Sequence, residues 1–125
     1  MKPFPTRGLY AITQTDNKQP DALFKAVAAA IRGGAVAIQY RDKNPSDALK
    51  VARELVKICH QHNIPLIIND DIELTLESSA DGVHLGKDDG ELTDAKSRLG
   101  NAAIIGVSCY NSIERALTAQ ALGAS

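Results

Sequence analysis

The sequence has no apolar run near the roughly 20 residues that a membrane-spanning helix needs. It also has no low-complexity segment and no repeat of fixed length. Its first residues, Met1–Arg7, lack the apolar centre of a secretory signal peptide. We therefore expect a cytoplasmic protein that does not bind a membrane.

A charge excess of either sign is missing as well, because 14 basic and 15 acidic residues leave a formal net charge of −1. Proteins that bind nucleic acid through its phosphates usually carry a clear basic excess. We expect no nucleic-acid partner, and any recognition of phosphate must be local.

Cysteine is scarce, and Cys59 and Cys109 show neither metal-site spacing nor a C-x-x-C redox motif. In a reducing compartment both are expected to be packing residues, although a catalytic thiol at Cys109 remains an alternative. The 125 residues, 44% of them apolar, fit a single domain spanning 1–125, with no second domain.

Short apolar segments alternate with segments of helical periodicity along the whole chain. Helices are expected from Pro20, from Pro45, after residue 71, over 92–99 and over 113–122, each following one of five short strands: 8–13, 35–39, 66–68, 83–85 and 103–107. This order predicts an α/β fold with a parallel sheet and right-handed crossovers.

A doubly wound sheet and a (β/α)₈ TIM barrel both satisfy this alternation. A doubly wound nucleotide-binding sheet usually has a glycine-rich turn after its first strand, but residues 13–17 contain no glycine. The sequence therefore favours a TIM barrel, in which active groups follow the carboxyl ends of several strands.

Polar residues follow four successive strands of this pattern. They are Gln39, Arg41 and Lys43 after the second strand, Asn69 and Asp70 after the third, Asp88 and Asp89 after the fourth, and Ser108 after the fifth. Carboxylates from neighbouring strands suit Mg²⁺, which takes one or two of them and shares its other positions with water and phosphate. Arginine and lysine bind phosphate directly, so the pattern indicates a metal-bound diphosphate.

Each of these groups has a plainer interpretation. The stretch 39–43 can be a solvated loop, 69–71 can cap the next helix, and 88–90 can be an ordinary turn. His60 and His62 are two residues apart on a helix, so we expect them to interact with its carboxyl end rather than with one ligand. His84, within a strand, is expected to be a hydrogen-bonded core residue.

Taken together, the motifs resemble the thiamine-phosphate synthase family (thiamine phosphate pyrophosphorylases). The matches follow the order of the family's motifs over almost the whole chain: Gly8-Leu9-Tyr10, Gln39-x-Arg41-x-Lys43, Ile67-Ile68-Asn69-Asp70, Ala80-Asp81-Gly82-Val83-His84-Leu85-Gly86-x-x-Asp89 and Ile105-Gly106-Val107-Ser108. Their collinearity is more specific than any single motif.

The resemblance implies a (β/α)₈ barrel that joins 4-amino-2-methyl-5-(diphosphooxymethyl)pyrimidine to a thiazole phosphate, giving thiamine phosphate and pyrophosphate. It implies that the diphosphate leaves first and that the thiazole nitrogen captures the resulting cation. It places Asn69, Ser108 and the stretch Gln39-Tyr40-Arg41-Asp42-Lys43 on the pyrimidine diphosphate, and it makes Asp70 and Asp89 ligands of Mg²⁺. No residue is assigned as an acid or a base.

Against the family pattern, the 125 residues correspond to about five N-terminal strand–helix units of the barrel. We therefore expect either a fragment of a longer barrel or a homo-oligomer whose partner covers the open sheet edges. Two alternatives to the synthase remain. One is a related thiazole tautomerase, and the other is a catalytically silent relative that binds only the pyrimidine diphosphate.

Overall fold

The structure is a computed structural model that describes residues 2–14, 19–86 and 89–125, with the backbone alone for residues 89 and 90. Strands and helices alternate strictly in these residues. The elements are β1 (Leu9–Ile12), α1 (Pro20–Arg32), β2 (Ala35–Tyr40), α2 (Ala48–Gln61), β3 (Leu66–Asn69), α3 (Ile72–Ser78), β4 (Gly82–Leu85), α4 (Asp89–Leu99), β5 (Ile104–Val107) and α5 (Ile113–Ala121). The predicted strand–helix alternation is confirmed.

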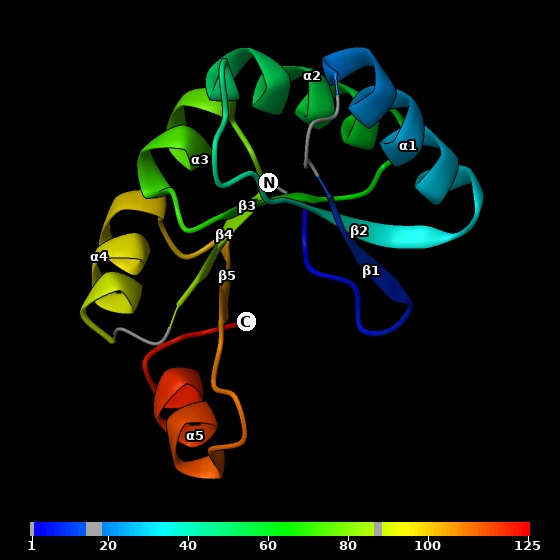
Figure 1. The fold of residues 1–125 in the computed structure, drawn as a ribbon. Coiled ribbons are helices and arrows are strands. Elements are labelled where there is room, and N and C mark those ends of the chain that lie inside the picture. Colours follow the sequence, from blue (N-terminus) through cyan, green and yellow to red (C-terminus); the bar gives the residue numbers. More distant parts are fainter. Residues whose placement is uncertain (1, 15–18, 87–88) are drawn as a thin grey trace.

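The five strands form one parallel sheet in the order β1-β2-β3-β4-β5. In Figure 1 the helices follow one another in an arc around one side of this curved sheet. A doubly wound sheet would instead place successive strands on both sides of its first strand. The sequential order is that of a TIM-type barrel, so the predicted fold class is confirmed, with β1 and β5 as the two edges of the part described.

The hydrophobic core lies between the sheet and the helices. Side chains of β2 and β3, including Ile38 and Ile68, pack against α1 and α2 in one cluster. A second cluster joins β4 and β5 to α4 and α5, and includes Leu85 and Ile105. Cys59 is fully buried in the first cluster and burial raises its pKa to about 12, as expected of a packing residue rather than a reactive thiol.

Short polar side chains determine where several helices begin. Asp47, Asp71 and Ser112 accept hydrogen bonds from the amides three residues later, at the starts of α2, α3 and α5. Because Asp47 is the cap, α2 begins at Ala48 rather than at the predicted Pro45. The fourth helix begins at Asp89, three residues before the predicted Leu92.

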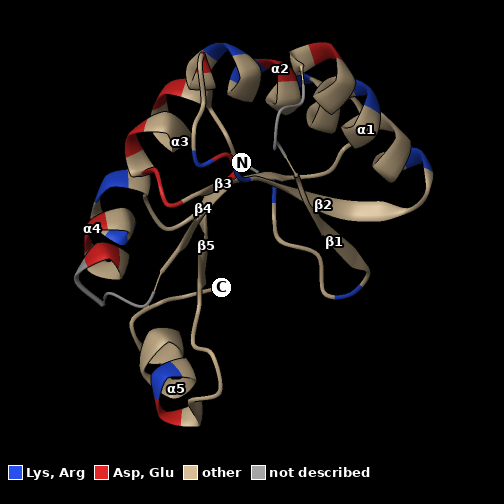
Figure 2. Cartoon of the chain, in the orientation of Figure 1, with Lys and Arg blue, Asp and Glu red and all other residues tan. Residues whose placement is uncertain are grey.

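Charge is excluded from the sheet. None of the five strands contains a lysine, arginine, aspartate or glutamate, and Figure 2 shows these residues on the helices and loops. Lysine, arginine, aspartate and glutamate therefore flank the strands and do not lie within them.

Candidate active site at the carboxyl edge of the sheet

The predicted site residues lie at or just beyond the carboxyl ends of the strands. Gln39 is the penultimate residue of β2, Asn69 is the last residue of β3, and Ser108 follows β5 directly. The strands are parallel, so their carboxyl ends meet at one edge of the sheet. This edge is where barrel folds carry their functional groups.

Gln39 is a buried polar group on the inner face of the sheet, the face away from the helices. The residue is only 3% exposed. Its Nε2 donates a hydrogen bond of 3.0 Å to the hydroxyl of Tyr10 in β1. The bond holds the amide in one orientation. Burial raises the pKa of Tyr10, and the bond from Gln39 opposes that rise. Sequence reasoning had not assigned Tyr10 a role.

Tyr40 lies on the opposite face from Gln39, because side chains alternate along a strand. It is 4% exposed and belongs to the cluster packed beneath α1 and α2. Burial, together with the charges of Asp42 and Asp47, raises its pKa to about 12. The structure therefore does not bring the Tyr40 side chain together with that of Gln39. The alternation of side chains along a strand could have predicted this from the sequence.

The loop after β2 is anchored to the end of β1. The Arg41 amide donates to the Thr13 hydroxyl at 3.0 Å, and that hydroxyl lies 3.2 Å from the Arg41 carbonyl, to which it can donate. Asp42 closes a local turn by accepting from the Asn44 amide at 3.0 Å. Arg41 and Lys43 are exposed beside this anchored backbone, so both cations lie at the carboxyl edge.

Asp70 follows β3 in a left-handed backbone conformation, with φ of 62°. Aspartate and asparagine tolerate this region better than other non-glycine residues. The Asp70 amide donates to the His84 carbonyl at 2.8 Å, and its exposed carboxylate accepts from Asn69 Nδ2 at 3.3 Å. The next residue, Asp71, caps α3, so the capping interpretation holds for Asp71 and leaves the Asp70 carboxylate for another role.

The other predicted metal ligand, Asp89, is the first residue of α4, and its side chain is outside the described part of the structure. Asp88 also lies outside the described residues. Among the side chains that are described, no three from His, Cys, Asp and Glu gather into a metal-binding group. The carboxylate oxygens of Asp70 are nevertheless hard ligands, the type that Mg²⁺ selects.

Ser108 and His84 form a second polar pair on the inner face. His84 Nε2 lies 2.9 Å from Ser108 Oγ. Burial lowers the pKa of His84, and the Asp70 charge partly opposes that shift. His84 is hydrogen-bonded, as predicted, but it is only half-buried and belongs to neither of the two core clusters. That its partner would be a predicted site residue was not foreseen.

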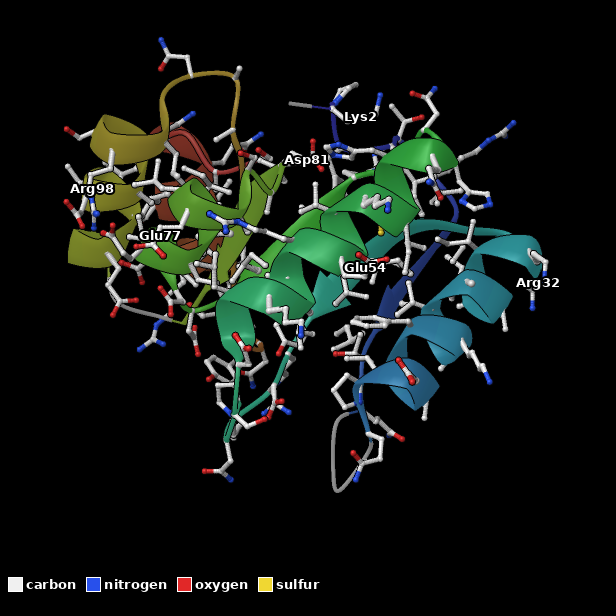
Figure 3. The ribbon with its side chains drawn as sticks, turned by 90° about the horizontal axis from the view of Figure 1, so that it is seen from above. Lys2, Arg32, Glu54, Glu77, Asp81 and Arg98 are labelled. Atoms are coloured by element: carbon white, nitrogen blue, oxygen red, sulfur yellow. The ribbon has the colours of Figure 1, made fainter. Side chains whose placement is uncertain are left out.

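The opposite, amino edge of the sheet contains a polar cluster that sequence reasoning missed. Asp81, which precedes β4, is completely buried and accepts hydrogen bonds from the Leu66 amide at 2.9 Å and the Lys2 amide at 2.7 Å. Its carboxylate also lies 2.8 Å from His60 Nε2. Figure 3 shows Lys2 beside Asp81. His60 thus lies in the last turn of α2, as predicted, but its ring contacts Asp81. His62 Nδ1 contacts a carbonyl near the end of α2, that of Ile58, at 3.0 Å.

Open pockets lie at the two edge strands. One of about 180 Å³ lies between β1 and α1, lined by residues that include Ala11 and Val27. Another of about 380 Å³ lies beside β5 and α5, where Ile113 and Leu117 are 78% and 60% exposed. Neither pocket is lined by Gln39, Asp70 or Ser108.

The sheet order and the polar groups at its carboxyl edge define the class of protein as a TIM-barrel-type α/β protein with polar side chains at successive strand ends. None of the helices that the structure describes has the length and apolar character needed to cross a membrane.

Comparison with known proteins identifies the family. Residues 9–125 match the family model described as thiamine monophosphate synthase, and the chain belongs to this family. It is 52% identical over 125 residues to thiamine-phosphate synthase of Methylococcus capsulatus, covering 98% of this chain and 55% of the relative. It is also 52% identical over 120 residues to thiamine-phosphate synthase of Nitrosococcus oceani, covering 94% of this chain and 55% of that protein.

A solved structure agrees with these sequence matches. Thiamine phosphate pyrophosphorylase from Pyrococcus furiosus superposes with a TM-score of 0.81 at 33% identity, over 92% of this chain and 55% of that one. The chain thus spans about half the length of the relatives that it matches.

Proposed function

We propose that this chain supplies the pyrimidine-diphosphate side of a thiamine-phosphate synthase, which forms thiamine phosphate and pyrophosphate from pyrimidine diphosphate and thiazole phosphate. The observation that carries the proposal is the common carboxyl edge of Gln39, Asp70 and Ser108, which come from the ends of three strands. About 50% identity to proteins named thiamine-phosphate synthase supports the substrate class.

Charged and uncharged residues of the chain would have different roles in binding the ligand. Arg41 and Lys43 are exposed cations beside the anchored loop, and they would bind the diphosphate and stabilise the charge that grows on it as it leaves. Gln39, Asn69 and Ser108 would provide uncharged hydrogen bonds to the same ligand. Tyr40, at the end of β2, and Asp42, in the loop that follows, would contribute through their backbone, since their side chains are used in the core and in the local turn.

Asp70 and Asp89 would hold Mg²⁺. The fit rests on the hard carboxylate oxygen of Asp70, exposed at the same edge as the proposed diphosphate contacts. When bound, Mg²⁺ would supply positive charge that favours departure of the diphosphate. The Asp70 backbone is already held in place by its hydrogen bond to the His84 carbonyl.

We further propose that the open edges of the sheet are covered in the working protein. Exposed apolar side chains occur at both edges: Leu9 and Ile12 on β1, and Ile113 and Leu117 on α5. Residues 1–125 would form a single partial barrel domain. Its edges would be covered by further strand–helix units of a longer barrel or by a second copy of the chain.

The other partners of the chain would be the small-molecule substrates in the cytoplasm, not nucleic acid.

The test is pyrophosphate release from the two substrates with Mg²⁺. It would use the 125-residue chain and a fusion of this chain to the remaining part of the Methylococcus capsulatus relative. We expect the fusion to release pyrophosphate and Asp70→Asn to abolish the release. Asp94→Asn, an exposed carboxylate change on α4, is the matched control and should leave the rate unchanged. Release that persists at the wild-type rate in Asp70→Asn would contradict the proposal.

A catalytically silent binding protein is the second candidate, because the groups proposed at the described carboxyl edge are all assigned to the pyrimidine diphosphate and its metal, and none to the thiazole phosphate. Calorimetry of the 125-residue chain with pyrimidine diphosphate and Mg²⁺ separates the two. Binding by a chain that shows no turnover, alone or in the fusion, would support the silent form.

A further inference from the structure

His84 lies on the inner face of β4, between β3 and β5. It pairs in register with Asn69 of β3 and with Gly106 of β5. Its carbonyl accepts the Asp70 amide at 2.8 Å, and its Nε2 is 2.9 Å from Ser108 Oγ. One residue therefore contacts two of the groups proposed to hold the ligand and its metal.

The absence of a side chain at Gly106 makes the position of the His84 ring possible. A Cβ atom at Gly106 would lie 2.5 Å from His84 Nδ1, closer than side chains approach one another. The ring thus lies across the glycine with Nε2 directed at Ser108, two residues further along. A larger residue at 106 would displace the ring from this hydrogen bond.

The Ser108 hydroxyl rotates freely unless a partner holds it, and it offers one proton and two lone pairs. The ring nitrogen uses one of these positions and leaves the others for a ligand. The Ser108 amide is held separately, donating to the Leu85 carbonyl at 3.1 Å. The serine backbone is therefore held by β4, and its side-chain oxygen is held by His84.

We infer that His84 is a positioning residue, which orients the Ser108 hydroxyl toward the bound pyrimidine diphosphate while Gly106 provides the space for its ring. This inference rests on the proposed function, because Ser108 is taken there to contact the ligand. If His84 acts through Ser108, removing the ring and removing the hydroxyl have the same consequence for binding, and their effects do not add.

The test is a double-mutant cycle measured by calorimetry on the 125-residue chain with pyrimidine diphosphate and Mg²⁺. His84→Leu and Ser108→Ala are each expected to weaken binding about 5-fold, as for loss of one ordinary hydrogen bond. The double variant should also lose about 5-fold, whereas independent effects would give about 25-fold and overturn the inference.

Two further variants separate positioning from general packing. His84→Gln can still reach Ser108 with a polar atom and is expected to restore binding to within about 2-fold of wild type. His62→Leu, an exposed histidine at the end of α2, is the matched control and should not change affinity. If His84→Gln binds as poorly as His84→Leu, a positioning role is overturned.

A measurement on the ligand-free chain separates failure of this inference from failure of the proposed function. The imidazole ¹⁵N resonances of His84 should shift on Ser108→Ala and stay unchanged in the control variant Thr118→Ala. An unchanged His84 resonance in Ser108→Ala overturns the inference even if the ligand binds. A chain that shows the shift but binds no pyrimidine diphosphate overturns the proposed function and the ligand role of the pair with it.

Discussion

Aspartate has opposite roles at the amino edge and the carboxyl edge of the sheet, where the strands begin and end. At the amino edge, Asp81 is completely buried, and its carboxylate is surrounded by the Leu66 amide, the Lys2 amide and the His60 ring. At the carboxyl edge, the Asp70 carboxylate is exposed beside Asn69. A buried carboxylate satisfied by its own chain holds the fold together, whereas an exposed one keeps its capacity for a ligand. In barrels, the amino face serves stability and the carboxyl face serves function.

The largest effect is expected from Asp81→Asn. An asparagine cannot accept all three bonds and places an NH₂ group against existing donors, so the free energy of unfolding should fall by about 3 kcal/mol. Urea unfolding measures the change. Asp94→Asn, which alters an exposed carboxylate, should stay within about 0.5 kcal/mol of wild type. Equal stability of the two variants would remove the contrast between the edges.

Asp70→Asn should show the reverse behaviour. Asparagine tolerates the left-handed backbone at this position, so stability should change by less than about 0.5 kcal/mol. Mg²⁺-dependent binding of the pyrimidine diphosphate should weaken about 10- to 100-fold, as expected for loss of a charged interaction. Calorimetry with and without Mg²⁺ tests this. A variant that loses stability but keeps Mg²⁺-dependent affinity would assign Asp70 to the fold instead.

Tyr10→Phe is expected to have a smaller effect at the carboxyl edge. It removes the hydroxyl that holds the Gln39 amide, at a distance of 3.0 Å, and leaves a buried N–H without that acceptor. The unfolding free energy should fall by about 1 kcal/mol and ligand affinity by about 5-fold. Denaturant titration and calorimetry measure the two. Unchanged affinity would show that Gln39 needs no support from β1.

The smallest effect at neutral pH is expected from Tyr40→Phe, because the Tyr40 side chain packs on the helix side of the sheet. Ligand affinity should not change. The difference should emerge in alkali, since the pKa of Tyr40 is raised from 10.0 to about 12 in the folded protein.

The sign of this pH effect follows from which state loses its proton first. Between pH 10 and about 12, the unfolded chain ionises at Tyr40 while the folded protein does not, so the free energy of unfolding falls as the pH rises. Cys59, with its pKa raised from 9.0 to about 12, acts in the same direction. Tyr40→Phe should therefore lessen the alkaline loss of stability without abolishing it. An identical pH profile for wild type and variant would contradict the burial of Tyr40.

Much of the fold could be predicted because its signals are local. The apolar strands, the helical periodicity and caps such as Asp71 are contained in a few consecutive residues, and the missing glycine-rich turn was enough to favour the barrel order. Helix starts were less accurate: α2 begins after its Asp47 cap, and α4 extends three residues further than its apolar pattern indicated. A cap residue and a polar first turn do not show in a hydrophobic pattern.

By itself, the sequence determined the alternation of strands and helices and the placing of Gln39, Asp70 and Ser108 at strand ends, because both depend on chain order alone. Only the tertiary structure decided what holds these groups. Gln39 pairs with Tyr10 across 29 residues, His84 with Ser108 across 24, and Lys2 with Asp81 across 79. Such pairs depend on strand register and on which face a side chain occupies. These are properties of the assembled sheet, which no short stretch of sequence specifies.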